Sequence, residues 1–110
     1  MSEELLVRES RRRREILRNL SRYLRTIAEV VKSLDPKARI YLFGSVAEGT
    51  SLTSSDVDIL IVTETLKPEE VIAQLWKHGI EDPFEIHVIK PEQLNTFKRT
   101  SKLIEINTSA

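Results

Sequence analysis

The stretch that decides the fold is "LFGSVAEGTSLTSSDVDILIV", Leu42 to Val62. An apolar segment ends there at a Gly-Ser pair, a polar loop follows, and Asp56 and Asp58 open the aliphatic run "ILIV". Because the side chains of a strand alternate between its two faces, both carboxylates are expected on one face. Like charges repel when they lie side by side, so the pair predicts a bound cation.

The residues around this pair indicate which cation and which ligand. Two aspartates suit a hard divalent ion such as Mg²⁺, which usually takes one or two carboxylates and completes its shell with water and phosphate oxygens. Gly44 lets the backbone turn and approach a ligand closely, and Ser45 adds N–H and hydroxyl donors for an anion. Together, the two motifs predict a nucleoside triphosphate held across magnesium.

A third acidic group is expected from the segment "FEIHVI", Phe84 to Ile89, which reads as a strand. Glu85 and His87 are two residues apart and therefore share one face. If this strand pairs beside the strand at 56–62, Glu85 completes a carboxylate triad. It would then ligate a second metal ion or take the proton from an attacking hydroxyl. His87 is the alternative for the same position.

The remaining elements follow from periodicity and from proline and glycine. We expect one long helix over residues 1–35, with an apolar face from Ile16 to Leu34. We also expect a strand at 40–43, a brief helix after Gly44, a helix from Pro68 to Gly79 and a last helix from about Pro91 to Arg99. The tail segment "KLIEI" is expected as a strand or as coil. The inward face of the helix after Pro68 is predicted to consist of Val71, Ile72, Leu75 and Trp76.

This order of elements predicts an α/β (α+β) fold in which helices pack on a small mixed sheet. The 110 residues are enough for one domain, residues 1–110, with its catalytic core at 40–90. No cysteine is present, no apolar run is long enough for a bilayer, and the start "MSEE" lacks the pattern of a signal peptide. We therefore expect a cytoplasmic protein without a membrane segment.

The motif "GSVAEGTSLTSSDVDILIV" resembles the signature of the nucleotidyltransferase superfamily that includes DNA polymerase beta. That signature is Gly-Ser, a loop of about ten residues, and Asp-x-Asp or Asp-x-Glu. Glu48-Gly49 and Ser54-Ser55-Asp56 are similar to the minimal nucleotidyltransferases of archaea and bacteria. The resemblance extends from about Ile40 to Ile89, and the first helix fits it loosely.

This resemblance implies the polymerase beta-like fold and two Mg²⁺ ions held by Asp56, Asp58 and Glu85. It also implies that Gly44 and Ser45 contact the triphosphate, most simply that of ATP. The reaction would be attack of an acceptor hydroxyl on the α-phosphate with release of pyrophosphate. Minimal members commonly act with a helical HEPN partner, and characterised pairs transfer AMP to a HEPN tyrosine that is thereby silenced as a toxin.

Other interpretations stay open on the sequence alone. The domain could be a non-catalytic antitoxin that occludes its partner, or it could act on a small molecule or an RNA end. The 17 basic and 17 acidic residues balance, which argues against a nucleic-acid partner, whereas the run from Arg8 to Arg14 leaves one open. The apolar face of the first helix could form a homo-oligomer or pack in the core.

Overall fold

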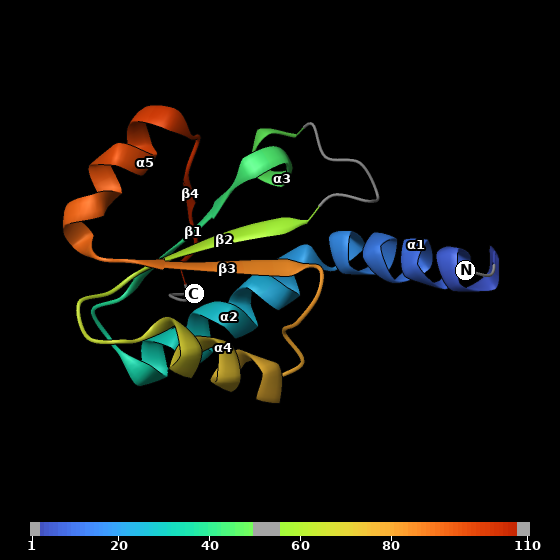
Figure 1. The fold of residues 1–110 in the computed structure, drawn as a ribbon, viewed down its shortest axis with the longest axis horizontal. Coiled ribbons are helices and arrows are strands. Elements are labelled where there is room, and N and C mark those ends of the chain that lie inside the picture. Colours follow the sequence, from blue (N-terminus) through green and yellow to red (C-terminus); the bar gives the residue numbers. More distant parts are fainter. Residues whose placement is uncertain (1–2, 50–55, 108–110) are drawn as a thin grey trace.

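The computed structural model describes residues 3–49 and 56–107, with side chains described from residue 11 onward (Figure 1). The side chain of Arg8 and the loop residues 50–55 lie outside this part. The helices are α1 (Glu3–Arg18), α2 (Leu20–Leu34), α3 (Gly44–Glu48), α4 (Pro68–Lys77), the 3-10 turn η1 (Pro91–Gln93) and α5 (Leu94–Thr100). The strands are β1 (Arg39–Phe43), β2 (Val57–Val62), β3 (Phe84–Ile89) and β4 (Ile104–Glu105).

The four strands form one mixed sheet in the order β3-β2-β1-β4. β2 and β3 run parallel, whereas β1 is antiparallel to both β2 and β4. The expected mixed sheet is therefore confirmed, and the pairing of β3 directly beside β2 is the condition on which the third acidic ligand depended. The tail segment adds the short edge strand β4.

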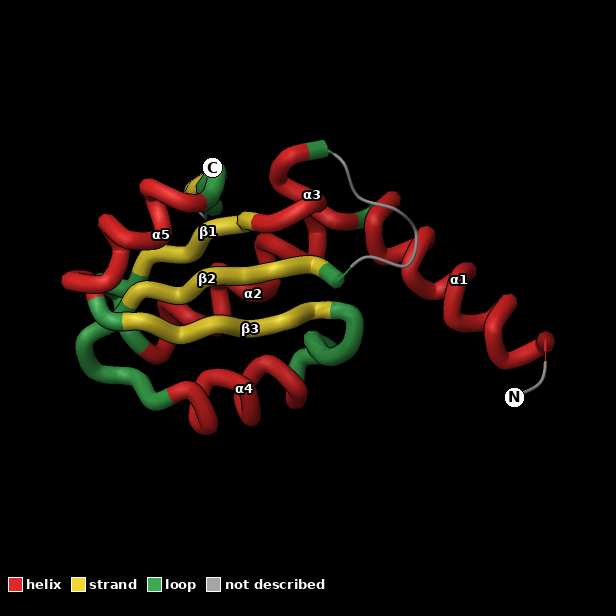
Figure 2. Tube along the Cα trace, turned by 45° about the horizontal axis from the view of Figure 1, so that its top comes forward, coloured by secondary structure: helices red, strands yellow, loops and turns green. Residues whose placement is uncertain are grey.

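Helices cover both faces of the sheet, with α2 and α4 on one side and α5 on the other (Figures 1 and 2). In β2, Val57, Ile59 and Ile61 point toward α2 and α4, whereas Leu60 and Val62 pack on the α5 side. This central strand is thus buried on both faces, as its aliphatic run predicts. Strand alternation places Asp58 on the same face as Leu60, the face that α5 covers.

The prediction of one helix over residues 1–35 is wrong at Asn19, where the chain divides into α1 and α2. The Asn19 side chain donates from Nδ2 to the carbonyl oxygen of Glu15 at 2.9 Å, the same oxygen that its own backbone N–H contacts. An asparagine that bonds to the local backbone competes with regular helix geometry. The apolar spacing continues across the break, which is why periodicity did not reveal it.

The prediction that Trp76 faces the core is also wrong, because its exposed fraction is 63%. Val71 and Leu75, one turn apart on α4, are completely buried. Trp76 follows Leu75 by about 100° around the helix. Val71 and Leu75 belong to the core cluster, whereas Trp76, the next residue around the helix, meets solvent.

The apolar face of the first two helices belongs to the core. Ile16, Ile27 and Val30 are buried, and Leu20 and Tyr23 pack against the same cluster. Core packing therefore accounts for this face, of which Leu34 alone has a large exposed fraction, 38%. Within the described residues, no helix is long and apolar enough to cross a membrane.

Candidate active site

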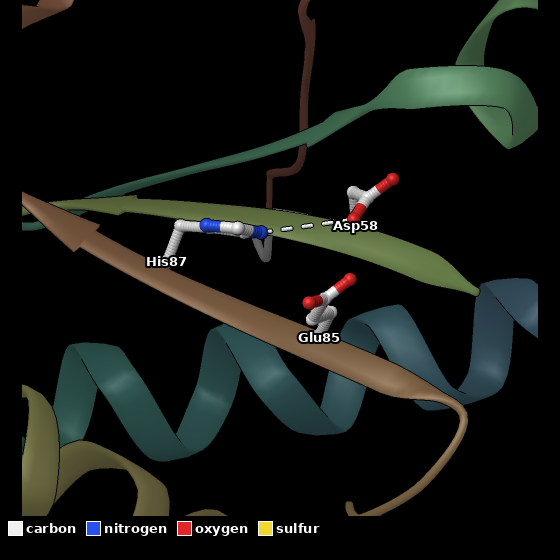
Figure 3. A group of neighbouring side chains, drawn as sticks. All are labelled: Asp58, Glu85 and His87. Carbon is white, nitrogen blue, oxygen red and sulfur yellow. Dashed lines mark ion pairs between the residues drawn. The ribbon is translucent and has the colours of Figure 1, made fainter.

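Two acidic side chains meet because β2 and β3 are in parallel register. Asp58 of β2 is the direct partner of Glu85 on β3, so their side chains leave the sheet side by side. Both side chains project from the same side of the sheet (Figure 3), which strand alternation identifies as the side on which α5 packs. Each is the second residue of its strand. Glu85 is exposed and Asp58 is partly buried, so the pair opens to solvent on one side.

His87 completes this group from the same face of β3. Its Nε2 lies 3.6 Å from Oδ1 of Asp58 (Figure 3). The imidazole ring stands edge-on to the ring of Phe43, with centroids 5.2 Å apart, and Phe43 in turn contacts Phe97 of α5. This aromatic packing fixes the imidazole so that Nε2 faces the carboxylates.

Gly44 brings the Gly-Ser turn against Asp58. Phe43, the residue before it, is the register partner of Asp58 across β1 and β2. Gly44 has φ +76°, in the left-handed region, and a Cβ atom at this position would overlap Oδ2 of Asp58. The glycine is therefore required twice, once for the turn into α3 and once for the space that the carboxylate fills.

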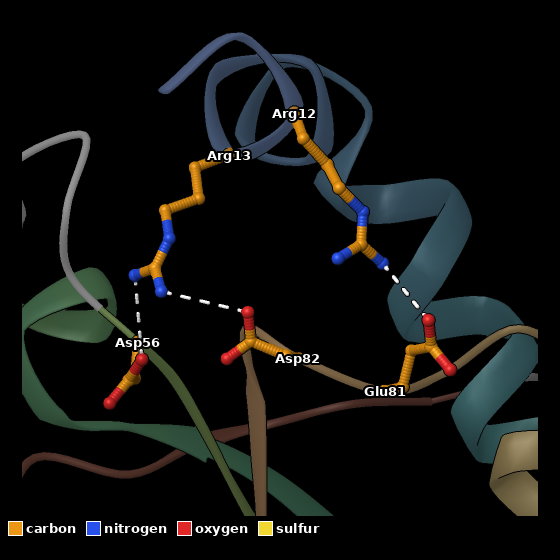
Figure 4. Close-up of polar contacts among 5 residues, drawn as sticks. All are labelled: Arg12, Arg13, Asp56, Glu81 and Asp82. Carbon is orange, nitrogen blue, oxygen red and sulfur yellow. Dashed lines mark ion pairs between the residues drawn. The ribbon is translucent and has the colours of Figure 1, made fainter. Parts of the chain in front are cut away.

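Asp56 is not part of this group. It lies just before β2, and its Oδ1 is 3.5 Å from Nη1 of Arg13 on α1 (Figure 4). The same guanidinium reaches Oδ2 of Asp82 at 3.6 Å, whereas Arg12 pairs with Glu81. A cation does lie beside Asp56, as the charge argument requires, and in this structure it is an arginine of the protein.

The three grouped side chains fit a divalent metal ion. One ligand atom from each of Asp58, Glu85 and His87 lies within 4.8 Å of the other two. Within the described part of the chain, the buried Nε2 of His87 has no hydrogen-bond partner. A buried polar atom without a partner costs free energy, and a bound ion or water would satisfy it. The two carboxylates suit a hard ion such as Mg²⁺ or Mn²⁺, and the imidazole suits a borderline divalent ion such as Zn²⁺ or Fe²⁺.

The sequence of residues 24–108 matches a family model described as a nucleotidyltransferase domain. This chain belongs to that family. The match begins within α2, so α1 and Arg13 precede the matched residues of this polymerase beta-like nucleotidyltransferase domain.

Solved structures agree with this membership. One crystal structure, of a protein assigned as a nucleotidyltransferase, is 31% identical with a TM-score of 0.60 and aligns with 74% of this chain and 95% of its own. A second protein so assigned, from Sulfolobus solfataricus, is 26% identical with a TM-score of 0.59, over 83% of this chain and 84% of its own. The small nucleotidyltransferase domain therefore occurs elsewhere at about the same length.

A further relative is a much longer protein. The inactive non-canonical poly(A) RNA polymerase protein Trf4-2 of Drosophila melanogaster is 30% identical over 86 residues, which are 76% of this chain and 21% of that protein. The chain thus spans about a fifth of the length of this relative.

The structure brings together most of the residues that the sequence singled out. Asp58, Glu85 and His87 form one group with Gly44 against it, and Ser45 follows Gly44 in the first turn of α3. Arg13 was part of the predicted basic run, but its contact with Asp56 was not foreseen. Arg13 precedes Ile16 by three residues and so lies on the inward face of α1, and that spacing was the available signal.

Proposed function

We propose that this nucleotidyltransferase domain transfers a nucleoside monophosphate, AMP from ATP, to an acceptor hydroxyl in a reaction that depends on Mg²⁺. The observation that carries the proposal is the group of Asp58, Glu85 and His87, whose ligand atoms lie within 4.8 Å of one another directly beside Gly44. A protein that offers carboxylates and an open side to a magnesium ion leaves the remaining positions to water and phosphate.

Asp58 and Glu85 would hold the metal, and His87 would take the open position or orient a ligated water. In the two-ion form of the reaction Asp56 joins them, which requires its carboxylate to exchange Arg13 for a metal ion. Bound metal would supply charge stabilisation for the attacking and leaving oxygens. Because Asp56 cannot bind a metal ion while it is paired with Arg13, Arg13 competes with the metal ion for this carboxylate.

The chain's own groups account for the remaining steps. Gly44 and Ser45 would contact the triphosphate, because a residue without a side chain lets the backbone approach closely. Glu85, the most exposed of the three grouped residues, would accept the proton of the attacking hydroxyl. The bond from the acceptor oxygen to the α-phosphorus forms, the bond from that phosphorus to the bridging oxygen breaks, and pyrophosphate leaves.

For the acceptor we propose a hydroxyl on a HEPN protein, with the transferase as its antitoxin. The support is the resemblance of the Gly44 to Asp58 motif to the minimal nucleotidyltransferases, and the small size shared with the solved neighbours. An RNA 3′ end is the second candidate. It is favoured by the similarity to the fly relative, an inactive poly(A) RNA polymerase protein.

The test separates metal binding, chemistry and acceptor. Mn²⁺ titration followed by electron paramagnetic resonance should show binding that Asp58→Asn and Glu85→Gln each weaken at least tenfold. Glu64→Gln, which changes an exposed carboxylate away from the group, is the matched control. Label from α-³²P-ATP should then appear on a HEPN protein of the same organism, and should disappear with Asp56→Asn combined with Asp58→Asn.

Each outcome is decisive for one part of the proposal. Undiminished transfer by the double variant would exclude this mechanism. Normal neutralisation of the HEPN protein by the same variant would favour simple occlusion by a non-catalytic binding module. Label on an added RNA in place of protein would identify the second candidate.

A further inference from the structure

Five arginines form a continuous row along the first two helices. Arg11, Arg14, Arg18, Arg22 and Arg25 are separated by three, four, four and three residues, and all five side chains are exposed. We call this row the arginine stripe. Positions three and four residues apart lie above one another on a helix, so the five side chains project from one face.

The break at Asn19 does not interrupt the row. The backbone N–H of Asn19 still donates to the carbonyl of Glu15 at 3.0 Å, and that of Tyr23 donates to the carbonyl of Asn19 at 3.4 Å. Both bonds join residues four apart, as in a regular helix, so the helical path continues from α1 into α2. With about 1.5 Å of rise per residue, the stripe is roughly 21 Å long.

The stripe faces away from the core. Ile16, Ile27 and Val31 lie on the opposite side of the same helices and are almost completely buried. At the α1 end, Arg11, Arg14 and Arg18 line a hollow of about 290 Å³ together with Glu15 and Asn19. A ligand can therefore reach the guanidinium groups without any rearrangement of the domain.

The charge of the stripe is not compensated within the described part of the chain. None of its five guanidinium groups has an ion pair there, whereas the neighbouring Arg12 and Arg13 pair with Glu81 and with Asp56 and Asp82. Like charges three or four residues apart weaken a helix slightly. Since the whole chain has 17 basic and 17 acidic residues, this concentration is local.

From this arrangement we infer that the arginine stripe binds the phosphate backbone of a nucleic acid strand. Guanidinium groups donate two parallel hydrogen bonds to a phosphate, a geometry that lysine does not offer. Each strand of a duplex carries about one charge per 3.4 Å of axis, so roughly six phosphates of one strand lie along the length of the stripe. Contacts to the backbone alone give binding with little sequence preference.

The alternatives fit less well. A helix that lies on a membrane must insert its apolar face, and the apolar face of α1 and α2 is occupied by the core. An acidic peptide would satisfy the charge, but among the side chains that the structure describes, from residue 11 onward, none of the exposed large apolar ones adjoins the stripe to anchor one. The inference concerns an interaction surface and does not require the transferase reaction.

The experiment uses the full chain and labelled 20-nucleotide probes of mixed sequence, as single-stranded RNA, single-stranded DNA and duplex DNA. Fluorescence anisotropy between 50 and 200 mM NaCl gives the affinity and its salt dependence. Combined Arg14→Gln, Arg18→Gln and Arg22→Gln should weaken binding at least tenfold at 50 mM NaCl. The slope of log affinity against log salt should become shallower by about 2 for the single-stranded probes and by nearly 3 for the duplex.

The control removes the same charge elsewhere. Lys98→Gln, Arg99→Gln and Lys102→Gln change three exposed residues at α5 and just beyond it, and should alter binding less than twofold. Circular dichroism melting confirms that both triple variants are folded. Asp58→Asn should bind the probes normally, so a failed transferase assay leaves this test unaffected. The RNA and DNA arms decide which nucleic acid is preferred.

Three results would overturn the inference. The first is the absence of salt-dependent binding of any probe at 50 mM NaCl. The second is an equal loss of affinity in both triple variants, because binding would then follow total charge. The third is binding to poly-glutamate or to phosphatidylserine vesicles that matches the nucleic acids in strength and in sensitivity to the stripe variants.

Discussion

Gly44 and Asp58 are packed so closely that a Cβ atom on Gly44 would clash with Oδ2 of Asp58. Gly44 begins α3 directly after β1, Asp58 lies near the start of β2, and the contact joins the Gly-Ser turn to the candidate metal group. It supplies a physical reason for the glycine that is independent of any ligand.

We predict that Gly44→Ala disrupts the metal group more than Gly49→Ala does, although both substitutions strain the backbone equally. Gly49 has φ +75°, like the +76° of Gly44, but a Cβ there meets nothing within 4 Å. Gly49→Ala should cost only the strain of the left-handed conformation, about 1 kcal/mol. Gly44→Ala should cost more in chemical denaturation and weaken Mn²⁺ binding at least tenfold. Equal effects of the two variants would show that the contact with Asp58 is unimportant.

Arg13 is expected to oppose metal binding. Its guanidinium lies 3.5 Å from Asp56, so removing the charge should lower the half-saturating Mn²⁺ concentration, and Arg13→Gln should do so roughly threefold. Arg12→Gln is the matched control, because Arg12 pairs with Glu81 and makes no contact with Asp56. Weaker metal binding by Arg13→Gln would mean instead that this arginine positions Asp56 for the metal.

Acid should destabilise the domain at the sheet end opposite the candidate site. The Thr63 hydroxyl, 2.5 Å from Oδ2 of Asp35, lowers the pKa of that carboxyl, and the Arg39 guanidinium likewise lowers the pKa of Glu105. Both carboxyls have a lower pKa in the folded chain than in the unfolded chain. Their stabilisation is therefore complete above the unfolded value near 4 and is lost as the pH falls through the folded value.

Urea denaturation at pH 7, 4.5 and 3 measures this effect. Asp35→Asn should lower the free energy of unfolding at pH 7 by about 1 kcal/mol, a modest loss because the carboxylate is partly exposed to solvent. The free energy of unfolding of this variant should also fall less steeply between pH 7 and pH 3. Glu64→Gln should leave the slope unchanged. If the free energy of unfolding of Asp35→Asn falls toward pH 3 as steeply as that of the unchanged protein, other carboxylates are responsible for the acid sensitivity.

Neighbouring residues of α4 should differ sharply in their contribution to stability. Leu75 is completely buried, and Leu75→Ala should lower the free energy of unfolding by about 2–5 kcal/mol. Trp76 is 63% exposed, and Trp76→Ala should change it by no more than about 0.5 kcal/mol. Thermal unfolding of both variants decides the matter, and a large loss from Trp76→Ala would place that ring in a contact that the structure lacks.

Much of the fold could be predicted because its signals are local. The aliphatic runs of β2 and β3 are too short and too β-branched for helices, and Pro68 and Pro83 bound the elements between them. Alternation within each strand was enough to place Glu85 and His87 on one face. The break at Asn19 and the exposure of Trp76 were missed, because periodicity shows that a face is apolar without showing how much of it a neighbour covers.

The sequence by itself determined the elements, the motif from Gly44 to Asp58 and the residue types that could hold a metal. Only the tertiary structure decided which of them meet. The parallel register of β2 and β3 places Asp58 beside Glu85, and the packing of α1 allows Arg13 to form an ion pair with Asp56. Such contacts depend on distances between segments that are far apart in the chain, and no local pattern encodes those distances.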